Sequence, residues 1–311
     1  MVEAYLVGDV GGTNTRLRII CLNGRIYNFI YETQRLSNLS ESIKDVLSKI
    51  KNIEIVNSCI GVPGPVEEGK FCKSHMINWE IDRSQILKDT GLKKLFLIND
   101  FEALGWSINV LNEKNHKKLN DIKINEGGIK CLVGAGTGLG VCKLVYDENK
   151  KIYVPLSSEA GHTTLAVRNL EEFRLLNFLK NIKRGKICNK DVLSGEGLEN
   201  IYRFFSGSKL NSKDVIKSEN EYSIETCKLF SKFYAKFVSD MALNCLAEGG
   251  VYIAGGIAID NPGLVSNQIF MNEFKDVCEH MKRTISRIPL FLITDSCLAL
   301  DGALFYLRLQ E

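Results

Sequence analysis

Two short glycine-rich segments have the composition of phosphate-binding turns. Gly11-Gly12-Thr13 follows an apolar run that ends near Asp9, and Gly136-Thr137-Gly138 lies within the sequence LVGAGTGLG. Glycine lets main-chain N–H groups approach an anion without a Cβ atom in the way, and each threonine adds a hydroxyl donor. Asp9 would repel a phosphate unless a cation such as Mg²⁺ lay between them, so it predicts a metal–phosphate site. One such turn could be an ordinary hairpin, but two favour phosphate binding.

Two other segments carry groups suited to acid–base chemistry and sugar binding. Asn99-Asp100 follows a predicted strand and precedes a predicted helix, where a carboxylate can deprotonate an attacking hydroxyl and an amide can position it. Capping of that helix is a compatible second role. Glu159 and His162 fall in an expected loop, and their polar groups suit the vicinal hydroxyls of a sugar better than a zinc ion.

A third glycine segment, Gly255-Gly256, ends a predicted buried strand. It could present a flat surface to a nucleotide base or ribose, or it could be a tight turn that allows close helix packing.

The elements expected to position these residues alternate along the chain. Expected strands cover residues 4–10, 16–22, 25–31, 53–60, 94–98, 129–133, 141–145, 251–254 and 289–293. Expected helices cover residues 39–50, 84–90, 101–111, 169–182, 194–205, 224–248 and 299–309. The Asn23-Gly24 pair predicts a hairpin between the second and third strands.

A polar stretch at 112–128 predicts weak structure and a domain boundary. We therefore expect an α/β protein with a smaller domain at 1–112 and a larger one at 113–298, the C-terminal helix at 299–311 packing back on the smaller domain.

Composition narrows the class of protein. The 311 residues are 45% apolar and 25% charged, as in ordinary globular proteins, and 40 Lys and Arg against 37 Asp and Glu give a net charge of +3. No basic block predicts nucleic-acid binding, and no apolar run has the length of a membrane span. Without a signal-peptide pattern we expect a cytoplasmic protein. Its ten cysteines form no C-x-x-C pair, and we expect them to be small buried apolar residues.

Six motifs in order resemble the bacterial ATP-dependent glucokinases, members of the hexokinase–actin–Hsp70 ATPase superfamily. The motifs are Asp9-x-Gly11-Gly12-Thr13-Asn14, Asn99-Asp100-Phe101, GAGTGLG at 134–140, Glu159-x-x-His162, Leu193-Ser194-Gly195 and IAGG at 253–256. The resemblance covers essentially the whole chain. It implies a two-domain actin-like ATPase (ribonuclease H-like) fold with an active-site cleft between the domains.

The resemblance also implies an activity, the transfer of the γ-phosphoryl group of ATP to the C6 hydroxyl of glucose. Asp100 would be the catalytic base, and Asn99, Asp100, Glu159 and His162 would hold the sugar. Gly255 and Gly256 would contact the adenosine. The phosphates would lie against Asp9, Gly11, Gly12, Thr13, Asn14, Gly136, Thr137 and Gly138, with Mg²⁺ bound to Asp9 through water.

The sequence departs from the family at two places. The related ROK sugar kinases carry a cysteine-rich zinc motif after the equivalent of His162, but Thr163-Thr164-Leu165-Ala166 follows here and predicts no structural zinc. The family's sugar-binding glutamate, four residues before Ser194, is replaced by Lys190. Lysine cannot accept a hydrogen bond but pairs well with a carboxylate.

Lys190 therefore makes a sugar acid such as 2-keto-3-deoxygluconate an alternative acceptor. A one-residue shift could instead place Asp191 where the glutamate lies, or Lys190 could point to solvent.

Two other classes of function fit the sequence less well. A sugar-responsive repressor would need a helix-turn-helix before the strand that begins near Ala4, and an actin-like or Hsp70-like ATPase would lack the paired sugar-binding segments. We expect a small-molecule sugar or sugar-acid substrate, with ATP and Mg²⁺, and no nucleic-acid or membrane partner. A homodimer is also compatible with the sequence.

Overall fold

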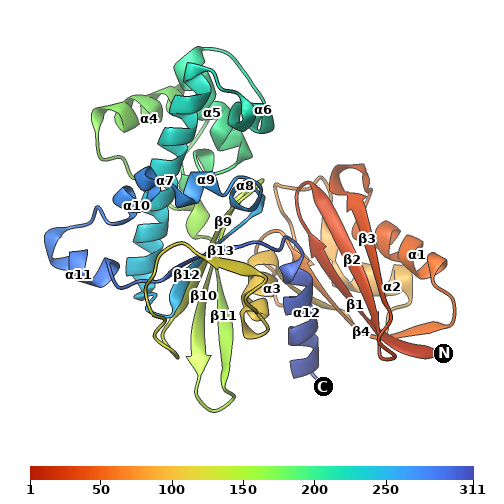
Figure 1. The fold of residues 1–311 in the computed structure, drawn as a ribbon. Helices are drawn as coiled ribbons and strands as arrows, with labels where there is room; N and C mark the ends of the chain where they lie inside the picture. The colour runs from red at the N-terminus through yellow and green to blue at the C-terminus, as the bar shows by residue number, and fades with distance from the viewer. The chain divides into compact units, whose positions relative to one another are not determined.

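The computed structural model describes residues 1–311, which divide into two compact units. Unit 1 comprises Met1–Asn112, Asn149–Ser157 and Cys297–Glu311, and unit 2 comprises Glu113–Glu148 and Ser158–Ser296. Each unit combines a twisted sheet with helices (Figure 1).

Unit 1 contains a five-stranded sheet in the order β3-β2-β1-β4-β7. Its strands are β1 (Val2–Val10), β2 (Asn14–Cys21), β3 (Ile26–Glu32), β4 (Ile53–Val62) and β7 (Phe96–Asn99). β1, β2 and β3 are antiparallel neighbours, whereas β1, β4 and β7 run parallel. The predicted Asn23-Gly24 hairpin is confirmed, since Gly24 adopts a φ of +89° and the Cys21 N–H donates to the Arg25 carbonyl at 2.8 Å.

The other elements of unit 1 are β5 (Phe71–Cys72), β6 (Ile81–Asp82), β11 (Ile152–Ser158), α1 (Leu39–Lys49), α2 (Arg83–Thr90), α3 (Asp100–Trp106), α12 (Leu298–Leu309) and the 3₁₀ turns η1 (Thr33–Arg35) and η2 (Ser107–Asn109). The helix expected at 101–111 is shorter, because it tightens into η2 after Trp106. The Asn109 side chain holds that turn by bonds to the Trp106 carbonyl and to main-chain groups of Tyr153.

Helix α12 completes the core of unit 1. Leu300, Ala303 and Leu307 are buried in a cluster with residues of β1, β4 and β7. Gly302 allows α12 to contact α3 closely, because a Cβ atom at this position would clash with the carbonyl oxygen of Ala103.

The central strands of unit 2 repeat part of this arrangement. Five strands of its sheet lie in the order β10-β9-β12-β13-β8, with β8 (His116–Lys118), β9 (Lys130–Ala135), β10 (Leu139–Asp147), β12 (Gly250–Ala254) and β13 (Leu290–Ile293). β9 is antiparallel to β10 and parallel to β12, as β1 is antiparallel to β2 and parallel to β4.

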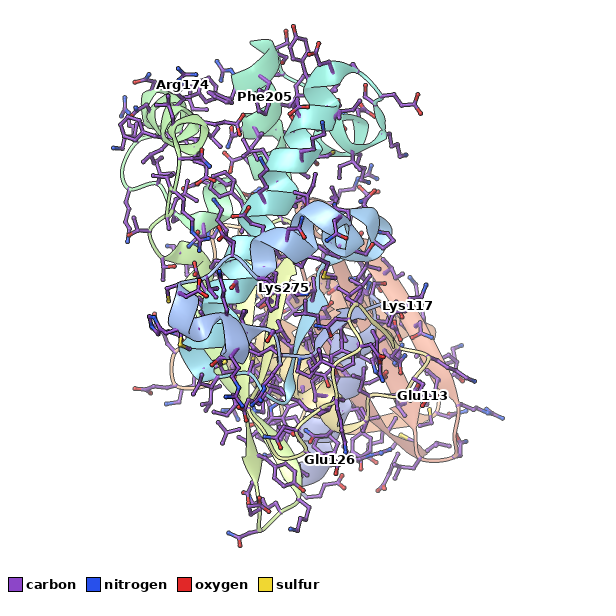
Figure 2. All side chains as sticks on the ribbon, turned by 60° about the vertical axis from the view of Figure 1, so that its left-hand side comes forward. Glu113, Lys117, Glu126, Arg174, Phe205 and Lys275 are labelled. Atoms are coloured by element: carbon purple, nitrogen blue, oxygen red, sulfur yellow. The ribbon has the colours of Figure 1, made fainter.

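The polar stretch at 112–128 is more structured than the sequence predicts, because β8 lies within it and pairs with β13. Charged side chains of this stretch, Glu113, Lys117 and Glu126, are exposed and point away from the ribbon (Figure 2). The pairing explains the error, since the partner strand lies more than 150 residues further along the chain.

The helices of unit 2 are α4 (Leu170–Ile182), α5 (Gly195–Ser206), α6 (Ser212–Lys217), α7 (Glu221–Cys245), α8 (Gly256–Asp260), α9 (Gly263–Ser266), α10 (Gln268–Phe274) and α11 (Lys282–Ile285), with 3₁₀ turns η3 (Ala160–His162), η4 (Asn189–Asp191) and η5 (Glu279–Met281). The long helix α7 packs beside α5 and α10 (Figure 1). It begins earlier than expected because Asn220 caps the Ser223 N–H, and it ends at Leu246, whose φ is +49°.

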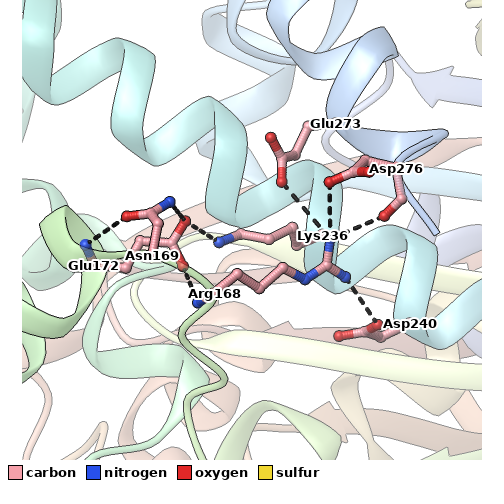
Figure 3. Close-up of polar contacts among 7 residues, drawn as sticks. All are labelled: Arg168, Asn169, Glu172, Lys236, Asp240, Glu273 and Asp276. Atoms are coloured by element: carbon pink, nitrogen blue, oxygen red, sulfur yellow. Dashed lines mark hydrogen bonds and ion pairs between the residues drawn. The ribbon is translucent and has the colours of Figure 1, made fainter. Parts of the chain in front are cut away.

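A buried ion pair joins the start of α4 to α7. Glu172 and Lys236 are 2% and 4% exposed, and Oε1 of Glu172 lies 2.5 Å from Nζ of Lys236. Arg168 reaches Asp240 at 3.9 Å and Glu273 at 3.8 Å (Figure 3). The same network therefore also contacts α10.

All ten cysteines are free. Six of them are buried, as expected for packing residues, whereas three are partly exposed and Cys278 is exposed. No helix combines the length and the apolar character that a membrane span requires.

Candidate active site

The first glycine turn links β1 to β2, and its carbonyls are all held by residues that follow β3. The Thr33 hydroxyl donates to the Gly11 carbonyl at 2.7 Å, the Gln34 amide to the Gly12 carbonyl at 2.9 Å, and the Thr33 N–H to the Thr13 carbonyl at 2.9 Å. These bonds fix the peptide planes of the turn. A turn whose amides are oriented in advance is what electrostatic stabilisation of phosphate requires.

Sequence reasoning missed Thr33 and Gln34. Thr33 is fully buried with its hydroxyl 3.0 Å from that of Thr15, and Gln34 also contacts the Met76 carbonyl and the Asn78 side chain. Both residues lie about 20 positions from the turn that they hold, so no local pattern marks them.

Asp9 lies near the end of β1, opposite Arg16 on β2. Its Oδ2 is 3.4 Å from Nη1 of Arg16. Burial raises the pKa of Asp9, and Arg16 opposes that shift. A nearby cation would stabilise the carboxylate. Mg²⁺ often binds one or two carboxylates together with water and substrate phosphates, so this single carboxylate fits a magnesium ion that arrives with the nucleotide. The structure has no group of three or more His, Cys, Asp or Glu side chains arranged to hold a metal.

Asn99 ends β7 and Asp100 begins α3. Oδ1 of Asn99 accepts from the N–H groups of Phe101 and Glu102 at 3.0 and 3.2 Å, so Asn99 caps the helix. Its amide also donates to the Gly64 carbonyl at 3.0 Å. Asp100 occupies the first turn, where the positive end of the helix dipole favours a carboxylate. Capping by Asn99 therefore fixes the backbone that carries Asp100.

The strand register brings Asp9 and Asn99-Asp100 to one edge of the sheet of unit 1. Asp9 lies opposite Gly61 on β4, and Gly61 lies opposite Ile98 on β7, all on parallel strands. Two strand spacings amount to about 10 Å. The carboxyl edge of a parallel sheet is where α/β proteins gather ligands, so unit 1 places the predicted phosphate turn and the predicted base on the same side.

The second glycine turn is the tip of the β9–β10 hairpin, where Ala135 pairs with Leu139. The Gly136 N–H donates to the Gly138 carbonyl at 2.8 Å, and the Gly136 carbonyl accepts from the Gly195 N–H at 2.9 Å. A Cβ atom on Gly136 would meet nothing within 4 Å. The fold itself does not require glycine here, and the open space suits the approach of a ligand to the main chain.

The two glycines after β12 differ from each other. Gly255 has a φ of +84°, and a Cβ atom on it would clash with the carbonyl oxygen of Ala135, so packing demands glycine. Gly256 begins α8, and a Cβ atom there would meet nothing within 4 Å. The tight-turn interpretation thus holds for Gly255, while Gly256 leaves open main chain.

Glu159 directly precedes the 3₁₀ turn η3 and His162 ends it, so the segment predicted as a loop contains one short 3₁₀ turn. Nδ1 of His162 is 3.0 Å from Oε2 of Glu159, and both side chains are about half exposed. Gly161 lets the turn pack against Leu139, since a Cβ atom would clash with the Leu139 carbonyl. Leu139 directly follows the second glycine turn, so unit 2 places the predicted sugar and phosphate segments side by side.

Lys190 lies on η4, next to η3. The main-chain and side-chain N–H groups of Asn189 donate to the Thr163 carbonyl at 3.0 and 3.2 Å. Asp191 is buried; its Oδ2 accepts from the Cys188 N–H at 2.8 Å and its Oδ1 lies 2.6 Å from Nζ of Lys183. Both carboxylate oxygens of Asp191 thus have partners in or beside the turn. The contacts do not support the alternative in which a one-residue shift of the alignment places Asp191 where the family's sugar-binding glutamate lies.

The chain is similar to known proteins along almost its whole length. The Glucokinase family model matches residues 6–310. A glucokinase of Yersinia enterocolitica is 33% identical over 320 residues, which cover 99% of this chain and 97% of that protein.

Two solved structures show the same fold. The glucokinase of Balamuthia mandrillaris in complex with glucose has a TM-score of 0.87 at 20% identity, covering 99% of this chain and 94% of that one. A ROK family glucokinase of Streptomyces griseus in complex with glucose and AMPPNP has a TM-score of 0.63 at 13% identity, covering 96% and 97%. Neither finding favours the sugar acid that Lys190 suggested. The chain belongs to the glucokinase family and is a sugar kinase with an actin-like ATPase fold.

Proposed function

We propose that the protein transfers the γ-phosphoryl group of MgATP to the C6 hydroxyl of glucose, with Asp100 as the catalytic base. Membership of the glucokinase family supports this proposal, as do the glucose and AMPPNP bound to its structural relatives. The observation that carries it in this chain is the common sheet edge shared by Asp9, the first glycine turn and Asn99-Asp100.

The carboxylate of Asp100 would orient the C6 hydroxyl and take its proton as the oxygen attacks the γ-phosphorus. The bond from that phosphorus to the β–γ bridging oxygen breaks, and ADP leaves. Because the transition state is loose, positioning and charge neutralisation account for most of the catalysis. The amides of Gly11, Gly12 and Thr13 with those of the second turn would hold the phosphates, and Asp9 would bind Mg²⁺ through water.

The sugar would be held by Asn99, Glu159 and His162, where the Glu159 bond fixes the orientation of the imidazole. A sugar hydroxyl accepts as well as donates hydrogen bonds, so Lys190 can serve a neutral hexose as a donor only. Gly255-Gly256 would face the adenosine. A cytoplasmic location and a homodimer stay predictions.

The test compares Asp100→Asn with the surface variant Asp89→Asn. Loss of a general base lowers rates by about 10²–10⁴-fold, so we expect Asp100→Asn to reduce kcat on that scale while calorimetry shows MgATP binding within about twofold of the parent protein. ADP release should be fastest with glucose among glucose, mannose, N-acetylglucosamine, gluconate and 2-keto-3-deoxygluconate. Parental kcat in Asp100→Asn, or lost MgATP binding in a folded variant, would contradict the assignment.

A further inference from the structure

We infer that the hydroxyl of Tyr234 positions the second glycine turn and the Gly255-Gly256 segment for nucleotide binding, an inference that rests on the proposed function. Tyr234 lies in the middle of α7 and is fully buried. Its oxygen accepts from the Ala135 N–H at 3.1 Å and donates to the Ala254 carbonyl at 3.3 Å. One side chain therefore contacts both segments.

The two contacted residues are the last of their strands. Ala135 ends β9 just before Gly136, and Ala254 ends β12 just before Gly255. The strands are parallel neighbours, with Ala254 opposite Gly134. The hydroxyl thus joins two strand ends at the point where each chain leaves the sheet to form a segment assigned to the nucleotide.

The geometry at this point tolerates little movement. Gly255 lies so close to Ala135 that a Cβ atom would clash with the Ala135 carbonyl. The Tyr234 ring is held edge-on by Phe230 and Phe270, with ring centroids 5.8 and 6.2 Å away. A fixed ring fixes its hydroxyl, and the hydroxyl sets the separation of the two main chains.

The protonation of Tyr234 suits this role. Burial raises the pKa of its hydroxyl, so the group keeps the proton that it donates to Ala254. Tyr234 is thus a positioning residue with a neutral hydroxyl that donates and accepts at once. Its loss would misalign the phosphate and adenosine segments, whereas the hydrogen bonds described for the sugar turns η3 and η4 do not involve its hydroxyl.

The test is Tyr234→Phe, which removes one oxygen and keeps the ring. We expect KM for MgATP to rise about tenfold and KM for glucose to stay within about twofold. Ser58→Ala is the matched control, because Ser58 in unit 1 is also buried and its hydroxyl donates to the Lys94 carbonyl. This control should lower the Tm by a similar amount without changing either KM.

An unchanged KM for MgATP in Tyr234→Phe, or an equal rise in both KM values, would overturn the inference. If the variant does not fold, NMR of the unsubstituted protein provides the test. The Tyr234 hydroxyl proton, identified by its contact with the Ala135 amide, should change its chemical shift when AMPPNP binds. An unchanged chemical shift would overturn the inference.

Hydrogen exchange separates this inference from the proposed function. AMPPNP should slow amide exchange at 134–140 and 254–258 in the unsubstituted protein. No protection there contradicts the proposed nucleotide site, whereas protection together with an unchanged KM in Tyr234→Phe contradicts only the role of Tyr234.

Discussion

The ammonium of Lys183 lies 2.6 Å from the carboxylate of Asp191 and connects the end of α4 to the turn that carries Lys190. Glu196 adds a more exposed contact to the same ammonium at 3.0 Å. Although burial works against its charge, the Cys188 N–H and the Lys183 ammonium lower the pKa of Asp191. The pair therefore stabilises η4 in its place next to η3.

Asp191→Asn should loosen this turn and weaken sugar binding. We expect KM for glucose to rise about fivefold to tenfold with KM for MgATP nearly constant, as steady-state kinetics with each substrate varied would show. Glu196→Gln is the control, because it removes only the exposed partner of Lys183, and it should leave both constants within about twofold. If the two variants behave alike, Lys183 and Asp191 do not position the sugar turn.

Thr33→Val should weaken nucleotide binding. The substitution keeps the shape of the side chain but removes the hydroxyl that donates to the Gly11 carbonyl. Removal of a partner from a buried polar group costs about 1–3 kcal/mol. We expect KM for MgATP to rise about fivefold or more. The control Ser42→Ala loses a buried hydroxyl that bonds only within α1. A lower Tm in Thr33→Val with unchanged KM would mean that the bond serves stability alone.

The buried pair Glu172–Lys236 should contribute to stability only as a pair (Figure 3). Glu172→Gln or Lys236→Met leaves one buried charge without its partner, which costs about 3–5 kcal/mol in the free energy of unfolding. The double variant Glu172→Gln/Lys236→Met should recover most of that loss. Urea unfolding of the four proteins measures the coupling. A double variant that loses the sum of the two single effects would contradict this interpretation.

Lys130 should make stability increase with pH in the alkaline range. Burial lowers its pKa from 10.5 to about 8, although its ammonium lies 5.5 Å from the centre of the Tyr252 ring. Between these two values the unfolded chain binds more protons than the folded one, so the free energy of unfolding rises with pH. Lys130→Met should thus be more stable than the parent at pH 7 by on the order of 1 kcal/mol, with a smaller difference near pH 10.

Urea midpoints at both pH values, with the exposed Lys180→Met as control, measure this effect. A difference between Lys130→Met and the parent that stays constant across the range would show that Lys130 titrates normally in the folded protein.

Much of the fold could be predicted from local patterns. The period of two in Arg16–Cys21 and the Asn23-Gly24 pair identify β2, β3 and their hairpin, and the stripe of Leu229, Phe233 and Phe237 identifies α7. In each case the same residues determine both the local conformation and the buried face. Helix α10 could also have been predicted, because Asn267 caps it and Phe270 and Phe274 have the spacing of one helix face, but it is missing from the elements expected from the sequence.

The rest depends on contacts between distant segments. β8 has little apolar pattern of its own and forms by pairing with β13, and Thr33 matters through a turn some 20 residues earlier. Tyr234 looks like an ordinary core residue of a helix until its hydroxyl is seen between Ala135 and Ala254. For the site, the glycine and acidic motifs could be predicted, but the side chains that orient them could not, since no spacing rule connects them.

The position of α12 affects how the chain matures on the ribosome. Leu300, Ala303 and Leu307 cover apolar side chains of β1, β4 and β7, yet this helix is translated after all of unit 2. At usual elongation rates, about 10–40 s pass between the synthesis of the N-terminal part of unit 1 and the synthesis of α12. During that interval α12 does not yet cover Val7, Cys59 and Ile98, so nascent chains should need chaperones more than the complete enzyme does.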